Sequence, residues 1–400
     1  MKMQVALNPR LLRLRPNPLV GILVVLTAIG FVVALIRYAS GIGAISNLSN
    51  TYPWGFWISF DLFTGVAISS GAFVMAAAVY IFELKQFQPL LRPTVLTEFL
   101  GYLMVIVALL VDLGRPERIW HMMVLWNHTS ILLEIGICVM SYTAVLAIEF
   151  APVLFEGLRW QKLANWIHRF IMPFVILGVV LSTLHQSSLG SLLLIQPEKL
   201  SPLWWTPLLP ALFFISAISI GLAMIILESV LSSRYFQRGL ETHLLEQLAR
   251  AIPIVLGIYL LVRFAQLTLS GNLRYAFSSG LLSVLFWAEI VLGSVIPLIL
   301  FSLRKLRQNP DGLLAGAIAL LAGMILNRFD VSWLAVHRLT DVRYVPSLPE
   351  ISISIAIFAF GILAFGLAVR YLPLFEWHQD SVTGPEQSRL RATRTGQAGD

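Results

Sequence analysis

The feature that most constrains this chain is a series of apolar runs, each about as long as a helix needs to cross a bilayer, roughly 20 residues. Ten such runs cover approximately residues 18–38, 56–82, 94–113, 130–151, 167–186, 206–231, 250–270, 281–303, 312–330 and 350–371. Only 12% of the residues are charged, about half the share in a soluble domain. The sequence therefore predicts an all-α, polytopic membrane protein with about ten transmembrane helices.

The polar segments are short, so no soluble domain is predicted between the helices. We expect a cytoplasmic basic N-terminus over residues 1–17, a transmembrane domain over 18–375, and a disordered cytoplasmic tail over 376–400. Most of the 28 lysines and arginines fall on one side if both termini are cytoplasmic, as the positive-inside rule requires. The net charge of +7 lies next to the membrane, so it indicates lipid head groups as neighbours rather than nucleic acid.

Cysteine and histidine usage argues against redox groups in the chain itself. The single cysteine, Cys138, cannot hold an iron–sulfur cluster, which needs about four thiolates. Two histidines lie in the apolar runs, His168 and His185. They share one predicted helix and are about 25 Å apart along it, so they cannot ligate one haem. We therefore predict no haem, no cluster and no metal site, and expect a partner to deliver any electrons.

Ionisable groups at membrane depth are costly and usually face the interior of the helix bundle. Six predicted helices place such a group at the level of the outer leaflet: Asp61, Asp112, Glu134, His185, Arg263 and Glu289. Any one of them could form a structural ion pair. Together they could bind a polar head group and exchange its protons.

A second polar group lies at the cytoplasmic level and consists of Glu98, Glu149, His168 and Glu228. Glu134 and Glu149 share one helix and are about 22 Å apart. Together with Glu228 they are candidates for proton transfer across the membrane. The alternative is that Glu149 reaches the head-group level and faces water.

Several stretches resemble the NrfD/PsrC family of quinone-interacting membrane subunits. They are Tyr52-Pro53-Trp54-Gly55 with Phe60-Asp61-Leu62, Ser130 to Glu134, Glu149 to Pro152, Leu184 to Ser191, Arg263-Phe264, and Phe286 to Glu289. The chain looks most similar to the HybB-like branch, which serves hydrogenase-2-type nickel–iron hydrogenases. The turn Asp112-Leu113-Gly114-Arg115-Pro116 departs from that branch and looks like the polysulfide-reductase type.

The resemblance implies two four-helix bundles with peripheral helices, in the bacterial inner membrane. It implies a menaquinone or ubiquinone site near the outer face, formed by Asp61, Asp112, His185, Arg263 and Glu289. Proton transfer would involve Glu134, Glu149 and Glu228. The partners would be a ferredoxin-like iron–sulfur subunit and a periplasmic catalytic subunit, either hydrogenase large and small subunits or a molybdoenzyme.

Two other classes of function stay open. A secondary transporter also buries carboxylates, but it often shows inverted repeats and helices broken at the midplane, and no repeat is evident in this sequence. A structural anchor that only tethers partners would not need buried charges on six helices, given what each costs. Co-purification of quinone with the protein would separate both classes from a redox subunit.

Overall fold

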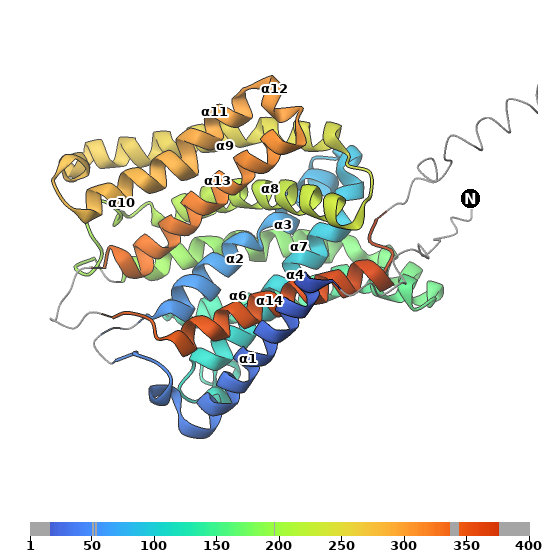
Figure 1. Ribbon diagram of the computed structural model, residues 1–400, viewed down its shortest axis with the longest axis horizontal. Coiled ribbons are helices and arrows are strands. Elements are labelled where there is room, and N and C mark those ends of the chain that lie inside the picture. The colour runs from blue at the N-terminus through green and yellow to red at the C-terminus, as the bar shows by residue number, and fades with distance from the viewer. Residues whose placement is uncertain (1–16, 50–51, 53, 196, 337–343, 376–400) are drawn as a thin grey trace, which may run out of the picture.

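The computed structural model describes residues 17–49, 52, 54–195, 197–336 and 344–375. Within these residues the chain is almost entirely helical, and ten helices are long and apolar enough to cross a membrane. The predicted all-α, ten-span architecture is confirmed. The helices run roughly along one direction as a bundle (Figure 1), with loops gathered at two ends. We call these the outer end and the cytoplasmic end, following the orientation predicted from the sequence.

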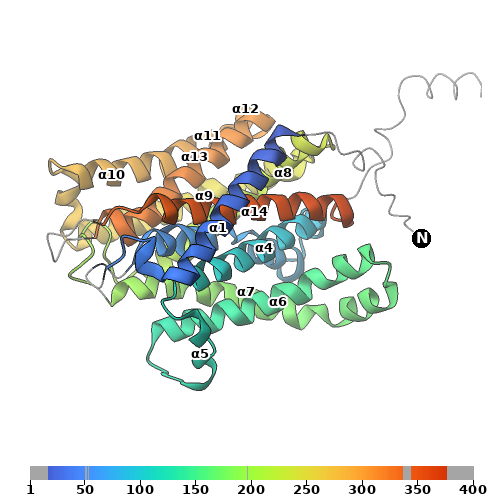
Figure 2. The same cartoon turned by 60° about the horizontal axis from the view of Figure 1, so that its bottom comes forward.

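The ten spans form two four-helix bundles and a peripheral pair. Bundle 1 contains the second span (Ile58–Ile81), α4 (Gln88–Asp112), α6 (Ile131–Gly157) and α7 (Gln161–Leu194). Bundle 2 contains α8 (Leu209–Phe236), α9 (Thr242–Leu269), the eighth span (Leu281–Ser302) and the ninth (Pro310–Leu334). The peripheral α1 (Pro18–Ser40) and α14 (Leu348–Tyr371) pack on each other, and α14 packs on α4 (Figures 1 and 2).

Local sequence signals explain where several helices begin. The side chains of Asn17 and Ser130 accept hydrogen bonds from free backbone N–H groups in the first turns of α1 and α6. Ser347 and Glu350 form a reciprocal capping box at the start of α14. Such caps satisfy N–H groups that have no partner within the helix, which matters most where the bilayer offers no water.

The second, eighth and ninth spans are not regular α-helices. The second span begins as a π-helix over Ile58–Thr64, continues as α2 (Gly65–Ile68), breaks at Ser69 and Ser70, and resumes as α3 (Gly71–Ala76). The eighth span, α10 (Leu281–Ile290) and α11 (Ile296–Ser302), contains the π-helical segment Val291–Val295. The ninth, α13 (Pro310–Phe329), ends in the π-helical segment Asp330–Leu334. Such segments are frequent at functional sites.

The fifth span is longer than the sequence indicated. The polar run Gln186-Ser187-Ser188 suggested that the helix ends near His185, but α7 continues to Leu194. The serine hydroxyls donate to carbonyl oxygens one turn back, Ser188 to Leu184 at 2.8 Å and Ser191 to Ser187 at 3.3 Å. Because their hydroxyls are satisfied within the helix, these serines extend it, and His185 lies more than two turns from its end.

Glycines set the closest approach between helices. In bundle 2 a Cβ atom on Gly323 of α13 would lie 2.0 Å from the backbone nitrogen of Gly293 in the eighth span. Between the bundles, Gly221 of α8 lies against the carbonyl of Ser70 at the break in the second span. The hydroxyl of Ser70 also donates to the carbonyl of Ala217 on α8 at 2.7 Å. Small residues thus let polar backbone groups meet across helices.

We expect Gly323→Ala to destabilise the protein by about 1–3 kcal/mol, because an added methyl group in a packed contact forces the backbones apart. Gly257→Ala is the matched control, since a Cβ atom on Gly257 of α9 meets no atom within 4 Å. The measurement is the thermal unfolding midpoint in one detergent. Equal midpoints for the two variants would contradict the role given to the Gly293–Gly323 contact.

Candidate functional site

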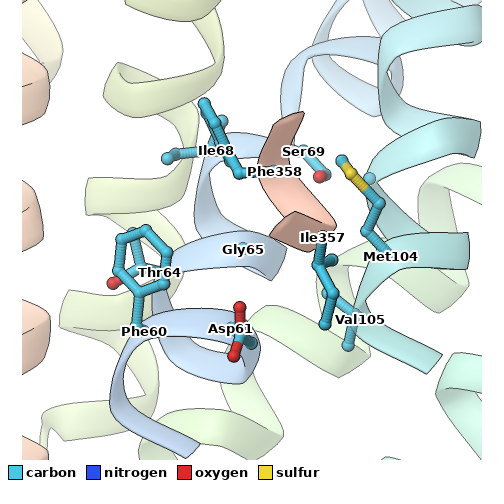
Figure 3. Close-up of a pocket in the computed structure, with 11 residues that line it drawn as sticks. Phe60, Asp61, Thr64, Gly65, Ile68, Ser69, Met104, Val105, Ile357 and Phe358 are labelled. Atoms are coloured by element: carbon cyan, nitrogen blue, oxygen red, sulfur yellow. The ribbon is translucent and has the colours of Figure 1, made fainter. Parts of the chain in front are cut away.

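A small cavity of about 50 Å³ lies between the second span, α4 and α14. Figure 3 shows its walls, with Asp61 and Phe60 on the second span, Met104 and Val105 on α4, and Ile357 on α14. The remaining lining residues are Thr64, Gly65, Ile68, Ser69, Gly101 and Phe358. The lining is mostly apolar and contains one carboxylate, a composition typical of small-molecule sites.

Asp61 is the only ionisable group among the lining residues, and it is 8% exposed. The hydroxyl of Ser354 on α14 donates to its Oδ2 at 2.7 Å. Asp61 lies in the π-helical segment, where the hydroxyl of Thr64 reaches the carbonyl of Ser59 five residues back at 3.1 Å. Ser354 thus fixes one carboxylate oxygen, and the other remains available to a ligand.

One edge of the cavity is open. Phe358 lines the cavity and keeps 45% of its surface exposed. It lies on α14, whose neighbouring residues Ile355 and Phe360 are also exposed and apolar, as expected for a face in contact with lipid. A ligand with a long apolar tail could therefore enter from the bilayer and leave its tail outside.

Aromatic side chains connect the cavity wall with the outer end. Phe60 stacks on Phe56 and Phe329, with ring centroids 5.5 and 6.1 Å apart. Trp333 packs edge-on against Phe329 at 6.0 Å and against Tyr344 at 6.0 Å. This packed column fixes the wall that carries Phe60.

Tyr344 holds the top of the aromatic column in place. Its hydroxyl accepts a hydrogen bond from the backbone N–H of Phe56 at 2.8 Å and donates to Glu350 at 3.1 Å. Burial raises the pKa of Tyr344 further above its ordinary value of 10.0, so the phenol remains a donor. The column is therefore tied to both the second span and α14, the two elements that form the cavity.

A buried chain of polar side chains crosses bundle 1. His185 on α7 shares a hydrogen bond of 2.8 Å between its Nδ1 and the hydroxyl of Tyr102 on α4. Tyr102 packs edge-on against Tyr142 of α6, with ring centroids 4.9 Å apart. Tyr142 donates to Oε1 of Glu98 at 2.7 Å. All four side chains are at most 1% exposed, so the chain lies wholly inside the bundle.

Glu98 is held by the break in the second span. Its Oε2 accepts hydrogen bonds from the backbone N–H groups of Ala72 and, at 3.2 Å, Phe73. These N–H groups belong to the first turn of α3, which has no helical partners for them and favours a negative charge. The break is therefore stabilised by the carboxylate that faces it.

The two other inner carboxylates lie close to this chain. Glu228 of α8 accepts a hydrogen bond of 2.7 Å from Thr97, the residue before Glu98. Glu149 of α6 lies against Gly178 of α7 and is only partly buried. Three of the four predicted inner residues, Glu98, Glu149 and Glu228, thus lie near one another. The fourth, His168, is 44% exposed and lies 3.4 Å from Glu156.

Arg238 lies near Glu228 at the cytoplasmic end. Its guanidinium group lies over the ring of Phe375 at 3.8 Å and donates to Ser232 at 2.9 Å. Burial lowers the pKa of Arg238, and the carboxylates of Glu228 and Glu241 oppose that shift. A positive charge thus covers the cytoplasmic side of Glu228.

Glu134 and Asp112 lie nearer the outer end. Glu134, in the first turn of α6, accepts a hydrogen bond from Ser188, one turn from His185 on α7. Asp112 ends α4 beside Arg37 of α1. Arg37 donates to the carbonyl oxygens of Val111, at 2.7 Å, and Leu113, and so caps the last turn of α4.

Arg263 and Glu289 meet inside bundle 2. Nη2 of Arg263 and Oε1 of Glu289 are 3.5 Å apart, and both side chains are at most 3% exposed. Oε2 of Glu289 accepts hydrogen bonds from Trp204 at 2.9 Å and Asn327 at 3.0 Å. Asn327 in turn accepts from Arg328 at 2.9 Å. The pair is therefore part of a larger buried network.

The structure distributes the eight sequence-predicted site residues over five places. Asp61 lines the cavity, and Asp112 lies beside Arg37. His185 lies on α7, one turn from the serine that binds Glu134. Arg263 pairs with Glu289, and Glu149 and Glu228 lie nearer the cytoplasmic end.

Five further buried polar residues were not predicted from the sequence: Tyr102, Tyr142, Asn327, Asp330 and Ser354. Tyrosine, serine and asparagine carry no charge, so depth alone did not single them out. Asp330 is the last residue of a predicted apolar run, a position where an aspartate is usually exposed to water at the end of a helix.

Comparison with known proteins gives consistent matches over most of the chain. Residues 44–335 match the protein family described as "Polysulphide reductase, NrfD". A relative from Nitratidesulfovibrio vulgaris Hildenborough, named only "Protein", is 38% identical over 91% of this chain and 95% of its own length. The "Probable Ni/Fe-hydrogenase 2 b-type cytochrome subunit" of Escherichia coli K12 is 33% identical over 84% and 87%. The "Menaquinone reductase, integral membrane subunit" of N. vulgaris is 30% identical over 84% and 86%.

We expect Glu289→Ala to destabilise the protein by about 3–5 kcal/mol, because it leaves buried donors, including the Arg263 guanidinium, without their acceptor. Asp311→Ala is the control. Asp311 pairs with Arg234, and their side chains are 77% and 48% exposed, respectively. Because the pair is exposed, its loss should lower the free energy of unfolding by at most about 1 kcal/mol. The check is the unfolding midpoint of both variants in detergent. Equal unfolding midpoints for Glu289→Ala and Asp311→Ala would contradict the stabilising role given to the buried network around Glu289.

Proposed function

The chain belongs to the NrfD/PsrC family, and on that premise we propose that it exchanges electrons between a partner iron–sulfur protein and membrane quinone. It would serve as the integral membrane subunit of a periplasm-facing respiratory complex of the hydrogenase-2 type. In the direction of quinone reduction, two electrons from the partner and two protons convert the quinone to the quinol. In the opposite direction the same electrons and protons are released.

The observation that carries this proposal is the cavity at Asp61. Its apolar walls suit the quinone ring, and Phe60 offers an aromatic face to it. Asp61 and its donor Ser354 offer one carboxylate oxygen that can accept a hydrogen bond from a quinol hydroxyl and take its proton. The open edge at Phe358 suits an isoprenoid tail that remains in the lipid.

The other residues of the predicted quinone site would act around the cavity. Asp112 and Arg37 would fix the outer end of α4, which forms one cavity wall. His185 would connect the quinone region to the buried chain that follows it. Arg263 and Glu289 belong to bundle 2, and we assign them to the charge balance of the quinone region.

Proton movement would follow the buried chain of bundle 1. Glu134 and His185 lie at its outer end, and Tyr102, Tyr142 and Glu98 continue it inward by the contacts described above. Glu149 and Glu228 would complete it toward the cytoplasm. Hydrogen-bonded hydroxyls can pass a proton by accepting one and donating another. Tyr102 and Tyr142 are in ring contact only, so a water molecule would have to bridge their hydroxyls for this chain to couple quinone chemistry to proton transfer.

Haem would not be required for this function. One relative bears the name of a b-type cytochrome subunit, and a haem inside the helix bundle would need two histidines that face each other. His168 and His185 both lie on α7, about 25 Å apart along the helix axis. The ring of His185 is fully buried against Tyr102, which occupies its Nδ1. Neither histidine faces the other, so these two residues do not fit as the axial pair of one haem.

The complex and its membrane would follow from the family. We propose the bacterial inner membrane, both termini in the cytoplasm, and a ferredoxin-like subunit docked at the outer end beside the catalytic subunit. A different catalytic partner, such as a molybdoenzyme of the polysulfide-reductase type, would leave the quinone site unchanged. Purification of the assembled complex with identification of its subunits distinguishes the two partners.

A secondary transporter is the second candidate function, and the broken second span favours it. Transporters often use half-helices whose N-termini face an anion, and α3 faces the carboxylate of Glu98 in this way. A transporter would show uptake that does not depend on an electron donor. Quinone-dependent turnover without such uptake supports the redox subunit.

We expect Ile357→Trp to lower quinone-linked turnover at least tenfold, because the larger side chain fills the cavity that Ile357 lines. Dye-linked activity of the catalytic partner should remain. Ile355→Trp is the control on the same helix, where Ile355 is 44% exposed toward lipid. Both activities are measured on the purified complex. Full quinone-linked turnover in the Ile357 variant would place the substrate elsewhere.

We expect Tyr142→Phe to lower the number of protons transferred per electron, because phenylalanine cannot donate to Glu98 and the route loses one of its hydroxyl groups. Tyr235→Phe, at a tyrosine that is 48% exposed, is the control. The measurement is the pH change inside vesicles during quinone-linked turnover. An unchanged proton-to-electron ratio would remove the bundle 1 chain from the mechanism.

A further inference from the structure

Bundle 2 contains a second group of buried ionisable side chains that the proton route of bundle 1 does not use. It consists of Tyr259 and Arg263 on α9, Glu289 on α10, and Arg328 and Asp330 at the end of the ninth span. Each side chain is at most 3% exposed. Two guanidinium groups and two carboxyl groups therefore share one small volume inside the membrane domain. We call this set the bundle 2 cluster.

Asp330 is the unusual member of the cluster. It is 0% exposed, and neither of its carboxylate oxygens has a hydrogen-bond partner among the described residues. The ionisable groups that interact with it electrostatically include Glu289, Arg263 and the phenol of Tyr259. An ionised carboxylate buried without a donor is very costly. Two adjacent carboxyl groups that share one proton avoid that cost.

Glu289 is the natural partner for that proton. Oε2 of Glu289 accepts from Trp204 and Asn327, whereas Oε1 has only the long contact of 3.5 Å to Arg263. Glu289 lies two residues before the π-helical segment Val291–Val295, and Asp330 begins another such segment. Both irregular turns of bundle 2 thus occur where the two acids meet.

The cluster has no ionisable path to the cytoplasmic end within the described residues. Most side chains that fill bundle 2 on that side are apolar and at most 1% exposed, among them Ile252, Leu256, Phe301, Leu313, Ala317 and Leu320. The buried hydroxyl groups there, those of Ser219 and Ser294, are not ionisable. The indole of Trp204, from the loop between α7 and α8, reaches Glu289 from the outer side. A proton on the acid pair would therefore exchange toward the outer end only.

The cluster lies next to the wall of the quinone cavity. Arg328 lines a narrow gap together with Thr64 and Ile68, and these two residues also line the cavity at Asp61. The guanidinium group of Arg328 lies 3.9 Å from the centre of the Phe213 ring and donates to Ser216 at 2.7 Å. Its charge is thus fixed at the boundary between the two bundles.

We propose that Glu289 and Asp330 form a reversible proton-binding site whose occupancy follows the charge in the quinone cavity. With one shared proton the cluster carries a net charge of +1, and without it the net charge is zero. Negative charge that arrives on the bound substrate favours the protonated form, because opposite charges attract strongly in a medium of low dielectric constant. The reciprocal effect follows by linkage. This inference rests on the proposed quinone function.

The test is an infrared difference spectrum between the oxidised and reduced states of the intact complex in native membranes. The wild-type complex should show a carboxyl C=O signal that shifts in D₂O. Asp330→Asn should remove that signal, and Glu289→Gln should remove or displace it. Asp311→Asn, at the exposed carboxylate on the cytoplasmic side, should leave it unchanged.

The same spectra distinguish a failure of the proposed proton-binding site from a failure of the proposed quinone function. Quinone bands that are present together with an identical carboxyl signal in Asp330→Asn would overturn the proton-binding site and leave the quinone function intact. Absence of quinone bands from the wild-type complex, after quinone has been added back, would overturn the proposed function itself. If Asp330→Asn does not assemble, Asp330→Glu keeps the acid. A carboxyl signal unmoved in that variant would assign the signal to another residue and overturn the inference.

Discussion

The membrane domain depends on one constraint: a backbone group exposed inside a bilayer must find its partner within the protein. The break at Ser69 and Ser70 creates such unpaired groups in the second span. Glu98 accepts from the freed N–H groups of Ala72 and Phe73, and α8 receives the hydroxyl of Ser70. The irregular backbone is thus stabilised from both bundles, and the cavity at Asp61 lies on the outer side of that break.

The two bundles have the same number of spans and differ in how their charges are arranged. Bundle 1 holds its polar groups in a line from His185 to Glu98 and onward to Thr97 and Glu228. In bundle 2 the buried ionisable side chains form one cluster, and mostly apolar side chains lie between that cluster and the cytoplasmic end. A line of groups suits transfer between the two sides of a membrane, whereas a cluster closed on one side suits storage. The second span, between these arrangements, is in contact with both.

The sequence predicted the spans and most of the buried charges because both depend on residue type and depth alone. It did not predict which charges meet. Arg263 and Glu289 are paired, whereas Asp61 is held by Ser354, an uncharged residue 293 positions away. Nor did it predict the length of α7, because serines can either end a helix or extend it by bonding to their own backbone. Contacts of this kind depend on packing between spans, which a single sequence does not record.

The π-helical turn that carries Asp61 has a consequence for comparing related chains. Such a turn contains one more residue than the α-helical turn it replaces, so it corresponds to a single-residue insertion in the gene. A relative with a regular helix at Ile58–Thr64 would align with this chain only if a one-residue gap is placed there. Without that gap, the aspartate would be compared with a residue on a different face of the helix, and its presence or absence across the family would be misjudged.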